Sequence, residues 1–156
     1  MTQPEAKRFT LAGVAMTRLV SGRQTGGLFC LFENASPGRT ATPVHVHAGD
    51  DETVYVLEGQ LTAILNGEPR TLSPGESLFL PRGIPHQLTN PDERPARYIL
   101  IGSPDVFEHF LAAAGRQLRQ GETAGPPTPD DIERLKAAAP RFGITLLPDW
   151  PAKPVG

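Results

Sequence analysis

Apolar and polar residues alternate in short runs over the first hundred positions, and turn residues interrupt the runs. Two β-rich stretches, Phe9–Val20 and Gly27–Glu33, are separated by a polar Gly/Ser/Thr segment at 21–26. Asn66-Gly67 is typical of two-residue hairpin turns, where both positions need a positive φ. Short strands with turn signals at intervals of about 8 to 12 residues predict an antiparallel sandwich or barrel. The later strands predicted in this way are Thr53–Glu58, Gln60–Leu65, Ser77–Leu80 and Arg97–Ile101.

The period of the pattern changes after residue 103. Ser103-Pro104-Asp105 is typical of a helix start, and apolar residues follow at helical spacing from Phe107 to Ala114. A Gly/Pro-rich loop then leads to a second amphipathic segment that begins at Thr128 and ends at Pro140. We therefore expect a β-barrel over 1–103 and a short helical, proline-rich tail over 104–156 packed on it. The loop 121–127 is either a lid over the barrel mouth or, as we favour, part of an outer brace or dimer contact.

Composition removes several classes of protein. The 17 Pro and 16 Gly in 156 residues exclude a bundle of long helices. A formal net charge of -2 argues against nucleic acid or an anionic membrane as the main partner. A single Cys excludes a disulfide framework and a Cys-based zinc site within one chain. The polar N-terminus and the short apolar runs predict a cytoplasmic protein that binds neither nucleic acid nor membrane.

Two histidines stand at strand spacing in His45-Val46-His47. Residues two apart point to the same face of a strand, so both imidazoles can converge on one point, although a pair on a solvated face is equally compatible with the pattern. Glu52 follows after a Gly/Asp turn and opens an apolar strand, where a buried carboxylate needs a partner such as a metal ion. We interpret the turn residues Asp50 and Asp51 as solvated.

His86 completes a candidate set of metal ligands. It follows a bend set by Pro81 and Gly83. Three imidazoles and one carboxylate suit Fe, Mn, Co, Ni, Cu or Zn, and the ligand types do not choose among them. Such a set leaves one or two positions of a five- or six-coordinate ion open, which is typical of a catalytic site. The alternative is an ion that only stabilises the fold.

The spacing of these residues resembles the two motifs of the cupin superfamily. His45-x-His47, four residues, Glu52, six residues and Gly59 match the first motif. Gly75, five residues, Pro81-x-Gly83, two residues, His86, three residues and Asn90 match the second. One departure is that six residues separate Gly38 from His45, where the motif usually has five. The resemblance implies an all-β fold, a double-stranded β-helix or jelly-roll barrel, with one divalent metal held by His45, His47, Glu52 and His86.

The chain is also similar to small single-domain bacterial cupins of the quercetin-dioxygenase type. In that family a flavonol binds the metal through a deprotonated hydroxyl, dioxygen adds, and the ring opens with loss of carbon monoxide. The similarity implies that Glu52 is both ligand and catalytic base, and that the chain forms a homodimer. The same fold also hosts isomerases, epimerases, decarboxylases and lyases that use the metal as a Lewis acid, and cupins that bind a small ligand without turnover. Our expectation is a dioxygenase acting on a small aromatic, flavonol-like or enolisable molecule.

Four further residues are candidates for a substrate pocket: Tyr55, Phe79, Arg82 and Phe107. The aromatic residues offer planar contacts, with core packing as the alternative. Arg82 would bind an anionic substrate at the barrel mouth, or it is an ordinary surface arginine. His109, on the first predicted helix, is expected at the surface.

Overall fold

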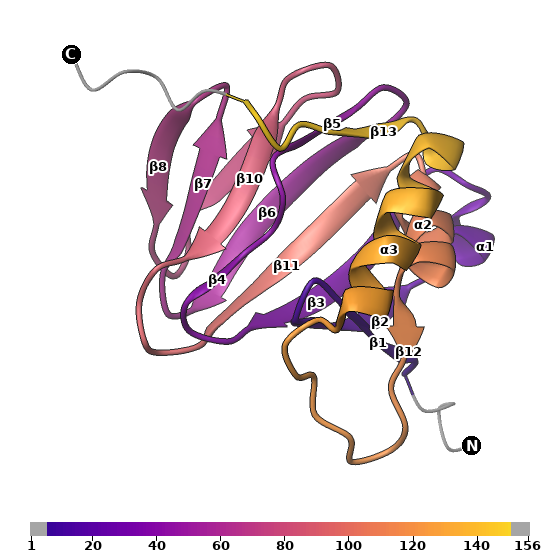
Figure 1. Ribbon diagram of the computed structural model, residues 1–156, viewed down its shortest axis with the longest axis horizontal. Coiled ribbons are helices and arrows are strands. Elements are labelled where there is room, and N and C mark those ends of the chain that lie inside the picture. The colour runs from indigo at the N-terminus through magenta and orange to yellow at the C-terminus, as the bar shows by residue number, and fades with distance from the viewer. Residues whose placement is uncertain (1–5, 151–156) are drawn as a thin grey trace.

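The computed structural model describes residues 6–150 as two antiparallel β-sheets with short helices at one end (Figure 1). The first sheet has seven strands in the order β12-β1-β2-β3-β11-β6-β9, and the second has the order β13-β5-β10-β7-β8, with β4 also paired to β10. The first sheet consists of β1 (Arg8–Leu11), β2 (Val14–Val20), β3 (Cys30–Ser36), β6 (Asp51–Glu58), β9 (Ser77–Leu80), β11 (Ala96–Ser103) and β12 (Arg116–Gln117). The second consists of β4 (Thr40–Ala41), β5 (His45–His47), β7 (Leu61–Leu65), β8 (Glu68–Leu72), β10 (His86–Asn90) and β13 (Ile144–Leu146). The all-β fold predicted from the sequence, a jelly roll with a short helical tail, is confirmed.

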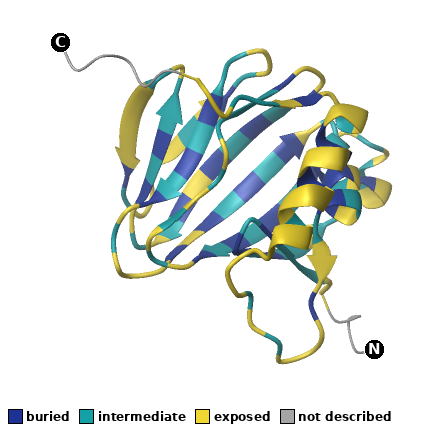
Figure 2. Ribbon diagram, in the orientation of Figure 1, coloured by how far each residue is buried: buried dark blue, intermediate teal, exposed yellow. Residues whose placement is uncertain are grey.

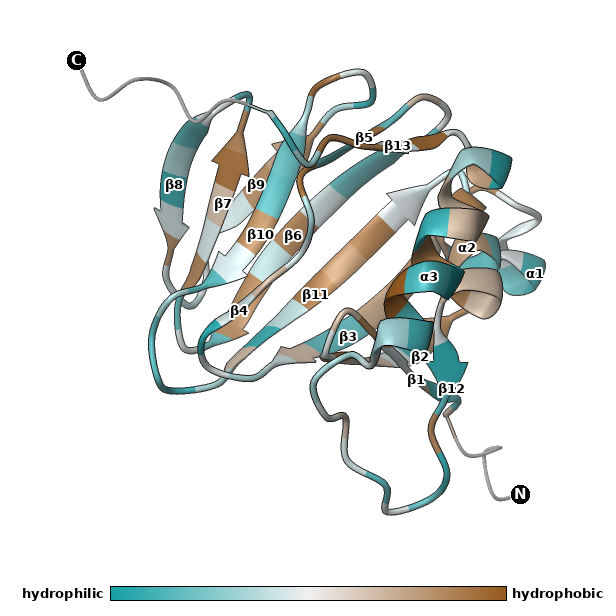
Figure 3. Ribbon diagram, in the orientation of Figure 1, coloured by the Kyte–Doolittle hydropathy of each residue, from teal (hydrophilic) through white to brown (hydrophobic). Residues whose placement is uncertain are grey.

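The core lies between the two sheets and follows from strict alternation along the central strands. In β3 and β11 every second residue is buried, so one face of each strand points inward. In Figure 2 buried and less buried blocks alternate along β11, and Figure 3 shows apolar segments in the same strand. Phe32 and Tyr98 are among the largest fully buried side chains. The interior is therefore mainly apolar, except where a few polar side chains point into it.

The predicted strands after residue 50 are confirmed, with ends shifted by no more than two residues. Asn66 and Gly67 have φ angles of 51° and 79° and form the turn between β7 and β8, as predicted. The stretch Phe9–Val20 is not one strand, because Ala12 and Gly13 also take positive φ and fold it into the β1–β2 hairpin. The polar segment 21–26 contains a short helix, α1 (Gly22–Thr25), capped by Ser21.

The tail adds helices and strands to the two sheets. Its helices are α2 (Val106–Ala114) and α3 (Pro129–Ala138), followed by the 3-10 turn η1 (Ala139–Phe142). The predicted cap at Thr128 is confirmed by its reciprocal hydrogen bonds with Asp131. The first helix begins later than predicted, with Asp105 rather than Ser103 at its N-cap. Strand β12 pairs with β1 and β13 pairs with β5, so the tail extends both sheets.

The expected barrel is open at the level of backbone hydrogen bonds. Over residues 6–150 the strands form two separate sheets, and no strand of one sheet pairs with a strand of the other. None of the helices in this range has the length and apolar character needed to span a membrane.

Candidate metal centre

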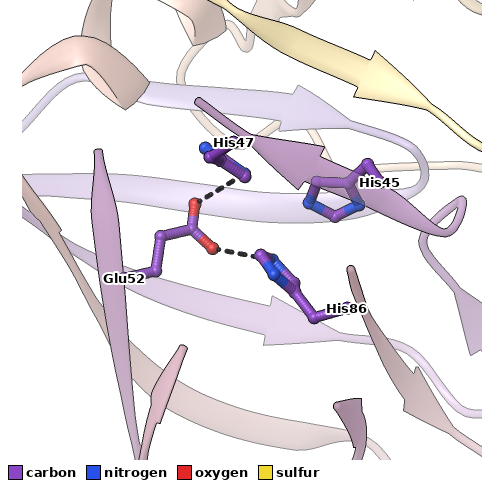
Figure 4. A group of neighbouring side chains, drawn as sticks. All are labelled: His45, His47, Glu52 and His86. Atoms are coloured by element: carbon purple, nitrogen blue, oxygen red, sulfur yellow. Dashed lines mark ion pairs between the residues drawn. The ribbon is translucent and has the colours of Figure 1, made fainter. Parts of the chain in front are cut away.

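Four side chains from both sheets converge inside the fold. His45 and His47 come from β5 and His86 from the start of β10, all in the second sheet, whereas Glu52 comes from β6 in the first. One donor atom from each residue lies within 4.8 Å of the donor atoms of the other three. Figure 4 shows the Glu52 carboxylate between the His47 and His86 rings, with His45 beside them. The structure thus brings together the four residues that the sequence pointed to.

Local backbone geometry explains this convergence. His45 and His47 are two apart on β5 and so point to one side, and His86 lies directly opposite His45 in the β5–β10 pairing. The bend before His86 is tied to β5, because the amide of Gly83 donates to the His47 carbonyl at 2.7 Å. Gly83 has a φ of 79°, a conformation that L side chains rarely adopt.

Two of the imidazoles have their Nδ1 atoms occupied. Nδ1 of His45 donates to the Pro43 carbonyl at 2.7 Å, and Nδ1 of His47 donates to Oδ1 of Asp50 at 2.9 Å. These bonds fix the tautomer in which Nε2 carries the free lone pair. Such partners orient a metal-binding histidine and raise its basicity.

The interpretation of Asp50 as a solvated turn residue is wrong. Asp50 is 1% exposed and its carboxylate is directed at the His47 ring. Its neighbour Asp51 does lie at the surface, where it binds Arg82 through both carboxylate oxygens. The turn thus supplies one carboxylate to the site and one to a surface ion pair.

The remaining donor atoms face one another without forming hydrogen bonds. Nε2 of His47 lies 3.5 Å from Oε1 of Glu52, and Nε2 of His86 lies 3.2 Å from Oε2. Both Nε2 atoms are buried and make no hydrogen bond to any of residues 6–150. Buried polar atoms without partners are costly. A bound cation would give all of them a common partner, so this donor set fits a divalent metal.

Side chains bind a metal in their deprotonated forms, and the pKa values of His45 and Glu52 favour these forms. Burial, together with the neighbouring His86 ring, lowers the pKa of His45 to about 4, so its imidazole is neutral at physiological pH. Burial raises the pKa of Glu52, but the imidazoles outweigh it and bring the pKa down to about 2. Burial also opposes a charge on His47, yet Glu52 and Asp50 together raise its pKa above 6.5. A proton therefore competes with a metal for His47.

Comparison with known proteins places this site in a family. Residues 31–102, which include all four converging side chains, match the family described as the cupin domain. These residues form a cupin domain. Quercetin 2,3-dioxygenase of Bacillus subtilis is 34% identical over 93% of this chain and 48% of its own length. The polyketide synthase protein TcmJ of Streptomyces glaucescens is 38% identical over 59% of this chain and 61% of its own.

Other relatives belong to different functional classes. The HTH-type transcriptional regulator PuuR of Escherichia coli is 33% identical over 61% of this chain and 51% of its own. Among solved structures, the polyketide cyclase RemF of Streptomyces resistomycificus has a TM-score of 0.53 and 24% identity over 65% of this chain and 70% of its own, which supports the fold. The cupin spans about half the length of the quercetin dioxygenase and the regulator. The proteins that resemble this chain thus belong to different functional classes.

Beside the four ligands the cupin contains a cavity of about 60 Å³. Its walls are mostly apolar side chains from both sheets and from α2 and α3, and none of its lining residues is Lys or Arg. An outer cleft of about 740 Å³ lies next to it. Five residues line both spaces: Leu11, Ala12, Thr42, Pro43 and Leu135.

The predicted pocket residues take different positions. Phe107, on α2, lines the cavity. Tyr55 and Phe79 do not, because the alternation along β6 and β9 turns them outward, where they are 42% and 55% exposed. Arg82 is held by Asp51 at the surface and does not line the cavity. His109 lies at the surface, as expected, and pairs with Asp105.

Other motif residues serve the backbone. The amide of Asn90 donates to the carbonyls of Ser36, Pro37 and Arg94, so it holds the loops around β10 together. At Gly59, where φ is 74°, a Cβ would lie 2.5 Å from the Pro95 carbonyl oxygen. Sequence reasoning missed Asn34, a buried amide that lines the cavity, because the predicted strand ended at Glu33 whereas β3 continues to Ser36. Cys30 and Phe32 alternate on the inward face of β3, and continuing that alternation by two residues would have placed Asn34 on the same face.

Proposed function

We propose that this cupin is a metal-dependent dioxygenase that opens a small aromatic, flavonol-like or enolisable substrate. The observation that carries the proposal is the union of a three-histidine, one-glutamate group with an apolar cavity that no Lys or Arg lines. A site for carboxylate or phosphate substrates would be expected to offer a cation, above all Arg. Arg82, the one candidate for that role, is engaged with Asp51.

The similarity to quercetin 2,3-dioxygenase over nearly the whole chain supports the same substrate class. The similarity to a polyketide synthase protein agrees with a planar, oxygen-rich ligand. This chain matches only 48% and 61% of the lengths of these two relatives. Their activities therefore support the proposal only together with the residues of the site.

His45, His47, Glu52 and His86 would hold the metal. When bound there, a divalent cation supplies Lewis acidity toward a substrate hydroxyl and open positions for exogenous ligands. The cavity walls would exclude water and pack against the faces of the rings. Phe107 and Phe110, both from α2, contribute aromatic surface to that wall.

Glu52 is the proposed proton acceptor for the substrate hydroxyl. Its carboxylate is buried, and its low pKa keeps it ionised at all physiological pH values. A base of low pKa takes a proton efficiently only from a hydroxyl that has itself become acidic. Glu52 can therefore act as the proton acceptor only when the substrate hydroxyl has been made acidic by a metal in the site.

The outer cleft would be the path to the cavity. A cavity of about 60 Å³ is smaller than the ~150 Å³ that holds one benzene ring. A multi-ring substrate therefore requires the wall shared by the two spaces to move. Leu135 on α3 and Pro43 before β5 are on that wall.

The test begins with elemental analysis of the purified protein, followed by oxygen uptake with flavonols, catechols and β-diketones. We expect uptake with at least one of these classes, and Glu52→Gln should retain some metal while losing turnover by about 10²–10⁴-fold. Glu58→Gln is the matched control, since Glu58 lies on the same strand but at the surface, paired with Arg97. Unchanged turnover in Glu52→Gln would remove the base role.

The same measurements separate the alternative functions. Product formation without oxygen consumption would replace the dioxygenase with a Lewis-acid isomerase, epimerase, decarboxylase or lyase. Tight ligand binding without any product under air would indicate a binding protein, as the similarity to a transcriptional regulator allows.

A further inference from the structure

The side chain of Asn34 is a buried amide without a well-formed hydrogen bond. It is fully buried on β3, and neither Oδ1 nor Nδ2 makes a hydrogen bond of good geometry to any of residues 6–150; the polar group that interacts with it is the phenol of Tyr98. The other buried amide, that of Asn90, donates to three backbone carbonyls. An unpaired buried amide destabilises a protein, so its presence calls for a partner from outside the chain.

Asn34 points into the same cavity as the metal centre, but toward the other end. Both Asn34 and Glu52 line this space. In the ladder of the first sheet, Asn34 pairs with Tyr98, and Tyr98 with Val56, whereas Glu52 lies four residues earlier on β6. Four residues of β-strand span about 13 Å. A ligand that contacts both residues therefore touches two separate parts of the wall, and the cavity of about 60 Å³ has to widen to admit it.

The surroundings of Asn34 define the chemistry it would meet. Tyr98, beside it, also lines the cavity, and burial raises the pKa of its phenol to about 12, while a hydrogen-bonding interaction with the Asn34 amide acts in the opposite direction. Tyr98 therefore stays neutral. Met16, opposite Asn34 on β2, is apolar. The amide offers one acceptor and two donors in a region otherwise suited to uncharged rings.

We propose that Asn34 is the binding residue for the end of the ligand remote from the metal centre, and that the ligand is a flat, uncharged, multi-ring phenol or hydroxy-ketone with polar substituents at both ends. The inference rests on the proposed function for the end held at the metal centre. The hydroxyl or carbonyl at the far end exchanges hydrogen bonds with the amide, which thereby gains the partner that the protein does not supply.

Two flavonols that differ in their outer rings test the inference by equilibrium binding. 3-Hydroxyflavone has the metal-binding hydroxyl and ketone but no outer hydroxyls, whereas quercetin has both. Zinc-loaded protein is titrated with each under nitrogen and followed by absorbance. We expect Asn34→Leu to weaken quercetin binding by about tenfold and to leave 3-hydroxyflavone binding unchanged. Equal effects on both flavonols, or no effect on either, would overturn the inference.

Thermal unfolding without ligand gives a second readout. Because the amide is unpaired, Asn34→Leu, which keeps its approximate size, should leave Tm unchanged or raise it by a few degrees. A clear drop in Tm would assign Asn34 a structural role and contradict the proposal. Met16→Leu is the matched control in the same cavity and should preserve the ratio of the two affinities. If Asn34→Leu does not fold, Asn34→Ala is used for the binding comparison.

The outcomes distinguish this inference from the proposed function. If the wild-type protein binds neither flavonol, both fail. If it binds both flavonols but consumes no oxygen, only the dioxygenase fails, and the response of quercetin binding to Asn34→Leu still decides the role of Asn34.

Discussion

The carboxylate of Asp50 acts on the metal centre through His47. Asp50 accepts a hydrogen bond from the Nδ1–H group of His47, which leaves Nε2 of that ring directed at the other metal ligands. Its negative charge also helps to raise the pKa of His47. No pattern in the sequence separates it from Asp51, because Gly/Asp turns are usually solvated. The two neighbours differ in one physical respect: β6 begins at Asp51, which points outward, while Asp50 lies in the bend that faces β5.

Removing this carboxylate should weaken metal binding. Partners of this kind are worth about 10–100-fold in affinity, so we expect Asp50→Ala to lose that amount and Asp50→Asn to lose less. Competition with a chromogenic chelator measures the affinity. Asp51→Ala, which breaks only the surface pair with Arg82, is the control and should bind metal as the wild type does. Equal affinities for wild type and Asp50→Ala would show that Asp50 does not assist His47.

At the scale of elements, β13 supports the strand that carries two ligands. Ile144 pairs with His47 and Leu146 with His45, and the amide of Ala48 donates to the Gly143 carbonyl at 2.9 Å. Three of the tail's elements, α2, α3 and β13, also contribute walls to the cavity. These contacts favour the brace over the lid as the tail's principal role.

Truncating the inward side chain of β13 should loosen this support. Ile144 is 2% exposed, so Ile144→Ala is expected to lower the free energy of unfolding by about 2–5 kcal/mol. Thr145→Ala, one position along and facing solvent, should change it by less than about 0.5 kcal/mol. Urea unfolding of the metal-free proteins measures both. Similar values for the two variants would mean that β13 contributes little to the fold.

Strand β13 is also an element that could not be predicted from the sequence. The four strands predicted after residue 50, which correspond to β6, β7, β9 and β11, were predictable because each has enough alternating positions and a Gly, Pro or Asn-Gly boundary. Ile144–Leu146 has three residues, too few to show a period, and its partner β5 lies almost a hundred residues earlier. The four ligands were predictable because their spacing is fixed by strands and tight turns. Asp50 and Asn34 were not, since their roles depend on which way a bend or a strand end faces.

At the scale of the whole molecule, the metal centre would join the two sheets. The histidines belong to the second sheet and Glu52 to the first, and the two ladders share no backbone pairing in the described chain. A cation bound by all four residues would connect layers that are otherwise held by side-chain packing. Metal binding is thus expected to stabilise the entire fold.

This coupling should appear in thermal unfolding and should depend on pH. Metal at about 100 times its Kd contributes about 2.7 kcal/mol, equivalent to a rise in Tm of about 5–10 °C for a protein of this size. Protonated His47 stabilises the metal-free protein below pH 6.5, and this contribution is lost as pH rises through its raised pKa. Glu52 remains ionised throughout, since its pKa is near 2.

The rise in Tm caused by metal should therefore be larger at pH 8 than at pH 6. Differential scanning fluorimetry with and without chelator, at both pH values, provides the measurement. A metal effect that is equal at the two values would show that no proton is displaced from His47. His86→Ala, with metal added, is the control that should remove most of the effect.

The placement of β12 and β13 has a consequence for how the folded chains behave toward one another. These strands cover the edges that β1 and β5 would otherwise present, and an uncovered edge is a template for pairing with another molecule. The two outermost strands on the other side are poor templates, because β8 contains Pro69 between charged residues and β9 is four residues long and ends before Pro81. A version of the chain that ended before the tail would expose two backbone edges, one of them bearing His45 and His47. The tail thus prevents strand pairing with another molecule at these two edges.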